Sequence, residues 1–366
     1  MNTDSLGQLI MTGVPGKELD PKTARLFRRV QPGAFILFGR NLENAAQLRK
    51  LIDDLRDLSE IEPIITIDQE GGRVSRLRLI GNEPPNAQQL RDKGEVDLIR
   101  RHGEITGRLL RLFGFNLDLC PVLDISFDDD AENSLRGRCY GKTVDEVVRN
   151  AAAFNDAMRG EGIASCGKHF PGYSAATSDA HYQLPRIDRT REELDQNELA
   201  VFRAFVSEVD SMMICHGWYP CFEPNQMPAT LSRRIVTELL RDEMGFDGLI
   251  MTDDLDMGAI LNGYRLEDAI RSGVSAGNDI VMICHRIPEI ETVHQILGTL
   301  PSDQIERAQQ DVSRFKKELS PPHKFSETAF RDINNEIRDL RITVVGEEDT
   351  AQPVIPERKV SPVERF

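Results

Sequence analysis

Eight short apolar runs recur along the chain, and polar stretches with helical spacing lie between them. We interpret these runs as strands at residues 6–14, 34–38, 63–68, 115–123, 162–168, 210–216, 248–253 and 279–284. Strands that alternate with helices pair in parallel, and eight such units close into a barrel. The sequence therefore predicts an α/β fold of the (β/α)8 TIM type.

Two of the intervening segments show the helical pattern clearly. Residues 44–58 (NAAQLRKLIDDLRDL) place Leu and Ile three and four positions apart, and residues 143–162 (TVDEVVRNAAAFNDAMRGEG) do likewise and end on glycine. The alternative fold is an open, doubly wound sheet. It lacks support, because no G-x-G-x-x-G opens a helix after an early strand and no G-x-x-x-x-G-K-[ST] occurs, and QEGGRV at 69–74 matches neither pattern.

The alternating pattern weakens after residue 320. We therefore expect one barrel domain over residues 1–320 and a C-terminal extension over 321–366. Within the extension, ITVVG at 342–346 predicts a short strand. The polar, proline-bearing segment 347–366 predicts a loosely attached tail.

Charge and composition argue against several classes of protein. The formal net charge of −15 would repel DNA or RNA, so no nucleic-acid partner is expected. The N-terminus does not resemble a signal peptide, and no apolar run approaches the roughly 18 residues that span a bilayer. The six cysteines form no C-x-x-C pair and indicate buried free thiols. We expect a soluble cytoplasmic protein without a membrane partner, either a monomer or a weak homo-oligomer.

Polar residues with chemical potential collect at the carboxyl ends of the predicted strands. They are Asp68, Arg138, Lys168, His169, Asp179, His181, His216 and Asp253. Taken singly, an Asp after a strand is usually a helix cap and a His is usually a hydrogen-bonded structural residue. Several of them together favour function, because the carboxyl ends of barrel strands face one shared site. The longest intervals between strands follow 63–68, 115–123 and 162–168, which predicts extra loops on that face.

The segment GLIMTDDLDMGAI (248–260) changes abruptly from apolar residues to carboxylates. Asp253 is expected at the strand tip, facing the barrel axis, while Asp254 is expected to point elsewhere and to cap the next helix. Adjacent carboxylates also occur in divalent-metal sites, but too few further oxygen ligands are apparent. A zinc site of His169, His181 and His216 matches no usual spacing. No metal and no organic cofactor are predicted.

An ordered set of motifs resembles glycoside hydrolase family 3, specifically its single-domain bacterial β-N-acetylglucosaminidases of peptidoglycan recycling. The motifs span roughly residues 6–300. They are ILFGRN (36–41), IDQEGGRVSRL (67–77), PVLDI (121–125), KHFPG (168–172), D-x-H (179–181), PATLS (228–232) and GFDGLIMTDDLDM (245–257). The resemblance implies an exo-acting, retaining β-N-acetylhexosaminidase that hydrolyses terminal N-acetylglucosamine. It also implies a substrate from the cell wall, in which this sugar is β-linked to anhydro-N-acetylmuramic acid.

The family's mechanism assigns roles to matching positions. The resemblance implies that Asp253 is the nucleophile that forms a covalent glycosyl-enzyme. It implies that His181, on a mobile loop, is the acid/base. Asp179 would hold the imidazole in one tautomer, and an extended segment would turn both side chains the same way. The implied sugar-binding residues are Asp68, Arg76, Arg138, Lys168 and His169, with Asp124 and His216 as weaker candidates at strand ends.

The chain departs from the family pattern close to the expected dyad. Tyr173 and Ser174 stand where His-Gly is usual, and Ala180 stands where Ser is usual between the Asp and the His. These changes bear on loop closure and leaving-group preference, and Asp256 adds a charge without an evident role. Three alternatives stay open: a family 3 β-glucosidase, a glycoside phosphorylase, and a catalytically weakened sugar-binding relative.

Overall fold

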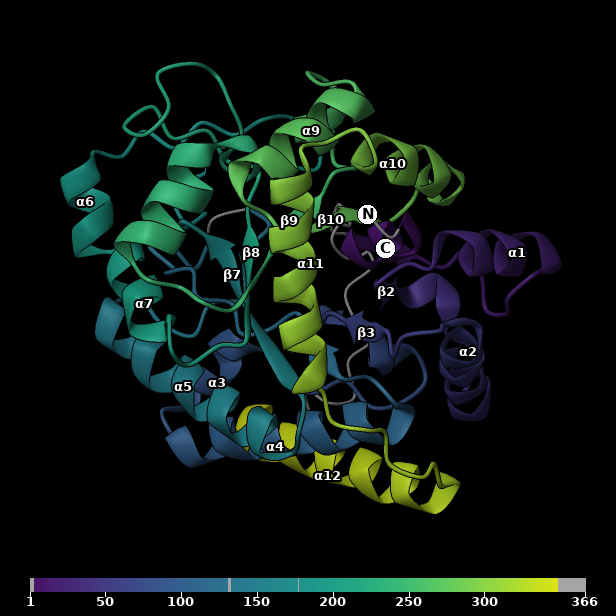
Figure 1. The fold of residues 1–366 in the computed structure, drawn as a ribbon. Helices are drawn as coiled ribbons and strands as arrows, with labels where there is room; N and C mark the ends of the chain where they lie inside the picture. Colours follow the sequence, from purple (N-terminus) through teal and green to yellow (C-terminus); the bar gives the residue numbers. More distant parts are fainter. Residues whose placement is uncertain (1–2, 131–132, 177, 348–366) are drawn as a thin grey trace.

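Eight parallel strands close into a barrel in the order β1-β10-β9-β8-β7-β6-β3-β2. The computed structural model describes residues 3–130, 133–176 and 178–347. The barrel strands are β1 (Ile10–Gly13), β2 (Ala34–Leu37), β3 (Ile64–Ile67), β6 (Leu117–Asp118), β7 (Ala164–Phe170), β8 (Ser211–Ile214), β9 (Leu249–Asp254) and β10 (Ile280–Ile283). Each falls inside or overlaps a predicted run, so the predicted (β/α)8 architecture is confirmed (Figure 1).

Helices surround the barrel, and a small antiparallel hairpin of β4 (Gln69–Gly71) and β5 (Val74–Ser75) follows β3. The α-helices are α1 (Pro21–Val30), α2 (Ala45–Leu58), α3 (Ala87–Lys93), α4 (Val96–Phe113), α5 (Val144–Gly160), α6 (Arg191–Gln196), α7 (Glu198–Phe205), α8 (Gly258–Leu261), α9 (Leu266–Ala276), α10 (Ile290–Leu297), α11 (Ser302–Lys317) and α12 (Glu327–Val345). The shorter or irregular helical segments are η1 (Thr3–Leu9), η2 (Gly39–Asn41), η3 (Arg76–Leu79), η4 (Ala229–Leu231), η5 (Arg234–Glu243) and η6 (Ile287–Glu289).

The two helices predicted most clearly are present, and their caps explain where they begin. The side chain of Asn44 accepts a hydrogen bond from the Gln47 amide at the start of α2. Thr143 does the same for the Glu146 amide at the start of α5. Such caps satisfy backbone donors that have no partner within the helix. The apolar stripe of each helix then faces the barrel.

Two strands are much shorter than predicted. Residues 6–9 belong to η1, where Gly7 packs so closely on the Val30 carbonyl that any Cβ would collide with it. The strand predicted at 115–123 forms a regular ladder only as β6. Pro121 has no N–H and interrupts the ladder, and Val122 then forms an isolated bridge with Lys168.

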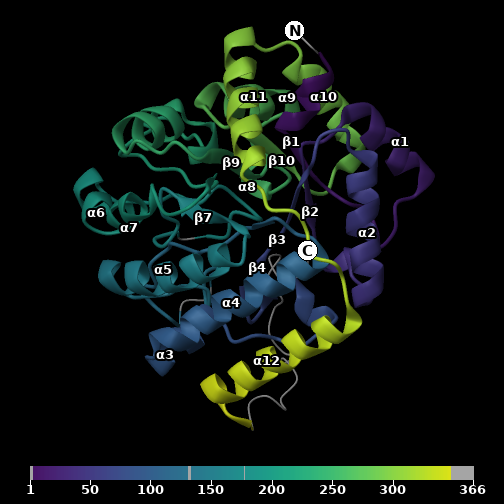
Figure 2. The same cartoon turned by 60° about the horizontal axis from the view of Figure 1, so that its bottom comes forward.

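The strand predicted at 342–346 is wrong, because residues 342–345 end α12 and Gly346 caps it. Ile333, Ile337 and Leu340 are buried on one face of this helix. The helix lies along α4 (Figure 2), and Glu336 accepts two hydrogen bonds from Arg108. Helical burial therefore outweighs the β propensity of ITVV. The expected tail falls almost entirely on 348–366, outside the described residues, and the domain division at residue 320 stays a prediction.

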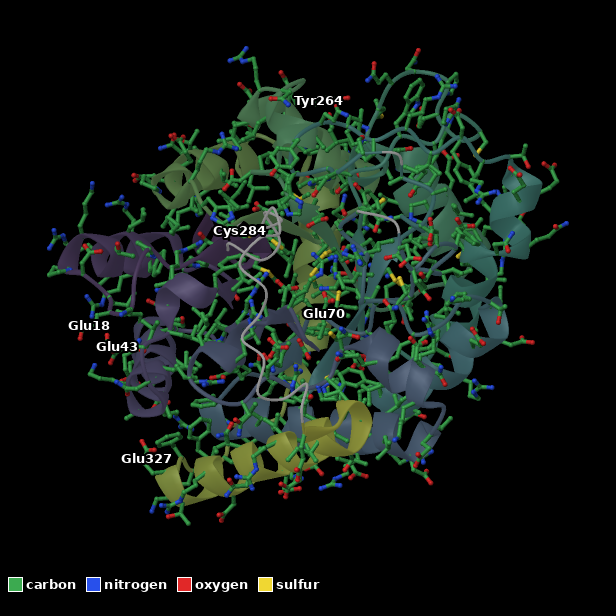
Figure 3. The ribbon with its side chains drawn as sticks, turned by 180° about the vertical axis from the view of Figure 1, so that it is seen from behind. Glu18, Glu43, Glu70, Tyr264, Cys284 and Glu327 are labelled. Carbon is green, nitrogen blue, oxygen red and sulfur yellow. The ribbon has the colours of Figure 1, made fainter. Side chains whose placement is uncertain are left out.

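Acidic side chains lie both at the periphery and in the interior. In Figure 3, Glu18, Glu43 and Glu327 lie at the edges of the molecule, whereas Glu70 and Cys284 lie over its middle and are buried. Five of the six cysteines are buried free thiols as predicted, and Cys221 is exposed, contrary to that prediction. Among the described residues, no helix combines the length and apolar character needed to cross a membrane.

Candidate active site

A cavity of about 510 Å³ opens at the carboxyl ends of the barrel strands. Its walls include the three predicted catalytic residues and the five predicted sugar-binding residues: Asp68, Arg76, Arg138, Lys168, His169, Asp179, His181 and Asp253. They come from segments far apart in the sequence, and parallel pairing of the strands brings them to one end of the barrel. The two weaker candidates, Asp124 and His216, are fully buried behind this wall.

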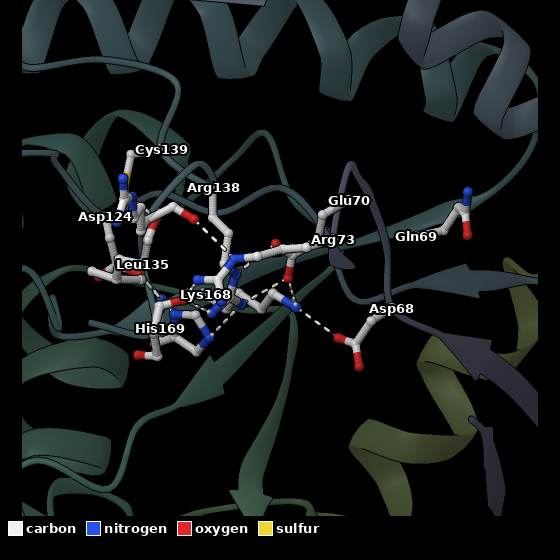
Figure 4. A network of polar contacts seen from close by, with 12 residues as sticks. Asp68, Gln69, Glu70, Arg73, Asp124, Leu135, Arg138, Cys139, Lys168 and His169 are labelled. Carbon is white, nitrogen blue, oxygen red and sulfur yellow. Dashed lines mark hydrogen bonds and ion pairs between the residues drawn. The ribbon is translucent and has the colours of Figure 1, made fainter. Parts of the chain in front are cut away.

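One side of the cavity is a continuous network of opposite charges (Figure 4). The Lys168 ammonium lies 2.8 Å from Asp68 Oδ1 and 2.6 Å from Glu70 Oε1. Arg138 donates two hydrogen bonds of 2.7 Å to Glu70, and Arg76 lies 3.3 Å from the second oxygen of Asp68. Paired in this way, the buried charges remain ionised in a place that would otherwise disfavour them.

The pKa values in this network follow from the pairing. Burial opposes the charge of Glu70, but Arg138 and Lys168 outweigh it and lower its pKa to about 2. The pKa of Asp68 is likewise lowered, because Lys168 and Arg76 overcome the effect of burial. Burial also opposes the charge of Lys168, yet Asp68 and Glu70 raise its pKa above the usual range. The site therefore presents fixed anions and cations at neutral pH.

His169 continues the network toward the loop after β7. Its Nδ1 lies 2.7 Å from Asp124 Oδ2, and its Nε2 lies 3.4 Å from an Arg138 nitrogen. Because a guanidinium only donates, this contact is compatible with a neutral ring whose proton lies on Nδ1. Asp124 also accepts hydrogen bonds from the backbone amides of His169 and Tyr173. Asp124 therefore fixes both the ring and the beginning of the loop.

The predicted dyad is formed, but not on an extended segment. His181 Nδ1 lies 2.6 Å from Asp179 Oδ1, and the same oxygen accepts the His181 backbone N–H at 2.9 Å. The Tyr182 amide bonds to the Asp179 carbonyl, which closes a turn. The expectation of an extended segment is wrong, because an Asp side chain readily bonds the backbone two residues ahead and bends the chain. Burial would raise the pKa of Asp179, but the bond to His181 lowers it overall.

The loop that carries the dyad is attached to the segment after β9. The Gly258 amide donates to the His181 carbonyl at 3.0 Å, and the Ala259 amide donates to the Ala180 carbonyl at 2.9 Å. Because α8 follows Asp253 by only a few residues, these bonds hold the imidazole and the Asp253 strand tip in one local unit.

Tyr173, one of the departures from the family pattern, stabilises this loop. Its hydroxyl donates to the Ser178 carbonyl and accepts from the Ala180 amide, each at 2.9 Å. The neighbouring Ser174 hydroxyl accepts from the Ile125 amide. The Tyr173 hydroxyl therefore bonds the loop backbone on both sides of Asp179.

The two carboxylates at the end of β9 have different surroundings. Asp253 lines the cavity and is partly exposed, with one oxygen accepting the Asp254 amide at 2.8 Å. Asp254 does not cap α8 as predicted. Its Oδ1 accepts instead from the amides of Asp256 and Cys284. Burial, then the neighbouring Asp256 charge, raises the pKa of Asp254 to about 8.

Sequence reasoning missed an imidazole on this side of the cavity. His285 lines the cavity, with Nε2 3.3 Å from Asp254 Oδ2 and Nδ1 3.0 Å from Arg40. Since Arg40 only donates, the ring proton lies on Nε2 and faces Asp254. Burial, then the Arg40 charge, lowers the pKa of His285 to about 4. His285 directly follows the run 279–284, so the strand-end rule could have found it.

Glu70 was also missed, although a signal for it exists. It lies two positions after Asp68 on an extended segment, where alternate side chains face the same way. Asp256, which had no assigned role, accepts the backbone amides of His285 and Arg286 and pairs with the Arg286 side chain. Within residues 3–130, 133–176 and 178–347, no group of three or more His, Cys, Asp or Glu side chains is arranged to hold a metal.

Comparison with known proteins identifies the family. Residues 2–315 match the model of the glycosyl hydrolase family 3 N-terminal domain. The chain belongs to glycoside hydrolase family 3. The family resemblance inferred from the motifs is thereby confirmed. The cavity residues therefore lie in a family 3 barrel.

Named relatives and a solved structure lie within the same family. A Beta-hexosaminidase of Vibrio cholerae is 33% identical over 300 residues, covering 81% of this chain and 87% of that protein. A Beta-hexosaminidase of Pseudomonas aeruginosa is 32% identical over 277 residues, covering 75% and 82%. The structure of a family 3 beta-N-acetylglucosaminidase from Paenibacillus is 30% identical with a TM-score of 0.84, and the match covers 93% of this chain and 69% of that one.

Proposed function

We propose that this family 3 protein is a retaining exo-β-N-acetylglucosaminidase, with Asp253 as nucleophile and the Asp179–His181 dyad as acid/base. The observation that carries the proposal is the shared cavity. It places a strand-tip carboxylate and a carboxylate-bonded imidazole on the walls of one space of about 510 Å³. A retaining glycosidase needs a nucleophile and a proton donor beside one glycosidic bond.

In the first step the Asp253 carboxylate attacks the anomeric carbon while the glycosidic C–O bond breaks. The leaving oxygen takes a proton from Nε2 of His181, the ring nitrogen that is not bonded to Asp179. In the second step His181 takes a proton from water, whose oxygen displaces Asp253 from the sugar. The net configuration at the anomeric carbon is retained.

Asp179 supports the charged form of the imidazole. Its carboxylate accepts a proton-bearing Nδ1 at 2.6 Å, and its lowered pKa keeps it anionic through both steps. The pairing leaves Nε2 as the nitrogen that exchanges the proton, and it stabilises the imidazolium that each cycle requires. A cationic acid also suits a site whose nucleophile is anionic, since the two opposite charges attract.

The charged side of the cavity is proposed to bind the terminal sugar. Asp68 is partly exposed and paired with two cations, which keep it anionic and make it an acceptor for sugar hydroxyls. Arg76, Arg138, Lys168 and His169 complete this set as donors or as orienting partners. For the natural substrate we propose a peptidoglycan fragment in which N-acetylglucosamine is β-linked to anhydro-N-acetylmuramic acid. The names of the Vibrio and Paenibacillus relatives support the hexosaminidase class.

Turnover of matched nitrophenyl glycosides tests the proposal. The protein is expected to hydrolyse the β-N-acetylglucosaminide much faster than the β-glucoside, and to release the β anomer first when the reaction is followed by NMR. Adding phosphate is expected to leave the rate and the product unchanged. Preference for the glucoside would assign a β-glucosidase, and a sugar phosphate product would assign a phosphorylase. Turnover of neither substrate would contradict the proposal.

A further inference from the structure

Tyr182 is an exposed aromatic residue in an unusual place. It directly follows His181, lines the cavity, and leaves 57% of its surface accessible to solvent. Exposed apolar side chains are common singly, but this one borders a site whose other walls are mostly buried. Its position on the rim beside the imidazole therefore has functional meaning.

The backbone of Tyr182 is held on both sides. Its amide donates to the Asp179 carbonyl at 3.0 Å, and its carbonyl accepts from Asn262 Nδ2 at 2.7 Å. The preceding His181 carbonyl accepts from the Gly258 amide. The backbone of Tyr182 is thus fixed relative to the dyad and to the segment after β9, so its side chain starts from a defined position beside His181.

The direction of proton transfer indicates what this surface meets. His181 gives its proton to the oxygen of the leaving group, so the leaving group lies on the His181 side of the bond that breaks. In the proposed function, the terminal sugar binds beside the charged network around Asp68. The residue next to His181 on the open rim therefore borders the leaving group.

We propose that Tyr182 forms the leaving-group subsite and stacks against the apolar face of a second pyranose ring. This inference rests on the proposed function and adds the residue that recognises the sugar ring of the leaving group. An aromatic ring is suited to this contact, because it buries a large apolar area at little cost in side-chain freedom.

The test compares two substrates that differ only in the leaving group. One is the β-1,4-linked dimer of N-acetylglucosamine, and the other is the trifluoroethyl β-N-acetylglucosaminide. Trifluoroethanol is about as acidic as a sugar hydroxyl, so both need similar protonation by His181, but only the dimer presents a ring to Tyr182. kcat/KM is measured for the wild type, Tyr182→Ala, Tyr182→Phe and the control Ile61→Ala, whose exposed side chain does not line the cavity.

Tyr182→Ala is expected to lose about threefold to tenfold in kcat/KM on the dimer and less than about twofold on the trifluoroethyl glycoside. Tyr182→Phe keeps the ring and is expected to match the wild type on both, as is Ile61→Ala. Equal losses of Tyr182→Ala on both substrates would overturn the inference in favour of a general role in positioning His181. Undiminished activity on both would also overturn it. A wild type that cleaves neither substrate would overturn the proposed function as well.

Discussion

Replacing Glu198 with glutamine is expected to change how the stability of the fold depends on pH. Glu198 begins α7 and is only 1% exposed, pressed against Gly172 of the loop after β7. Among the described residues neither of its carboxylate oxygens has a hydrogen-bond partner. Burial raises the pKa of Glu198 to about 7, opposed in part by the charge of Arg189 and reinforced by Asp124 and Glu193.

The magnitude follows from linkage between proton binding and folding. At pH values below 4.5, the ordinary pKa of a glutamate, the Glu198 carboxyl is protonated in both the folded and the unfolded state. Its ionisation then takes nothing from the free energy of unfolding. Between about pH 4.5 and 7 the unfolded chain ionises while the folded chain holds its proton, so stability falls as pH rises. The loss over this window is about 3 kcal/mol, since each pKa unit corresponds to about 1.4 kcal/mol.

Urea unfolding at intervals from pH 4 to pH 8 measures this effect. Glutamine cannot ionise, so the stability of Glu198→Gln relative to the wild type is expected to rise by about 3 kcal/mol across the range. The exposed Glu192 on the neighbouring helix provides the control, and Glu192→Gln is expected to show a flat difference. Other titrating groups occur in all three proteins and cancel. A difference between Glu198→Gln and the wild type that does not vary with pH would refute the reasoning.

Three further substitutions test the cavity. His181→Ala is expected to reduce kcat/KM by orders of magnitude more for the N-acetylglucosamine dimer than for the nitrophenyl glycoside, because nitrophenol needs little protonation; equal losses would contradict the acid role. Glu70→Ala removes the carboxylate that pairs with buried Arg138 and leaves Lys168 paired with Asp68 alone, and urea unfolding is expected to show about 3–5 kcal/mol of lost stability; a loss below about 1 kcal/mol would contradict the network. Tyr173→Phe removes two loop hydrogen bonds, and proteolysis within 173–182 is expected to accelerate about tenfold at unchanged global stability; unchanged cleavage would contradict the loop role.

The barrel was predictable because its strands are buried on both faces and read as continuous apolar runs. Ile280–Ile283 is an example, with four buried residues in succession. The gathering of Asp68, Lys168 and Asp253 followed from the same pattern, since strand ends meet in a barrel. Local propensity failed where tertiary contacts decided the outcome. The β-branched residues of 342–346 are helical, because α12 buries Ile337 and Leu340 beside α4.

The finer arrangement of the site lay beyond sequence patterns. The hydrogen bond from the Cys284 amide to Asp254 depends on the neighbouring β10 rather than on the segment that carries Asp254. His285 accepts a hydrogen bond from Arg40 because β2 and β10 lie on either side of β1 in the closed barrel. Such contacts join residues far apart in the sequence, and spacing along the chain contains no signal for them.

The nucleophile assignment is tested most directly by trapping the glycosyl-enzyme. A fluorinated N-acetylglucosaminyl fluoride that forms the intermediate faster than it is hydrolysed would label the protein, and the labelled peptide would be located by mass spectrometry. The account predicts one added sugar on the peptide that contains Asp253, and no label on Asp253→Asn. A stable label on another residue, or turnover by Asp253→Asn at the wild-type rate, would contradict it.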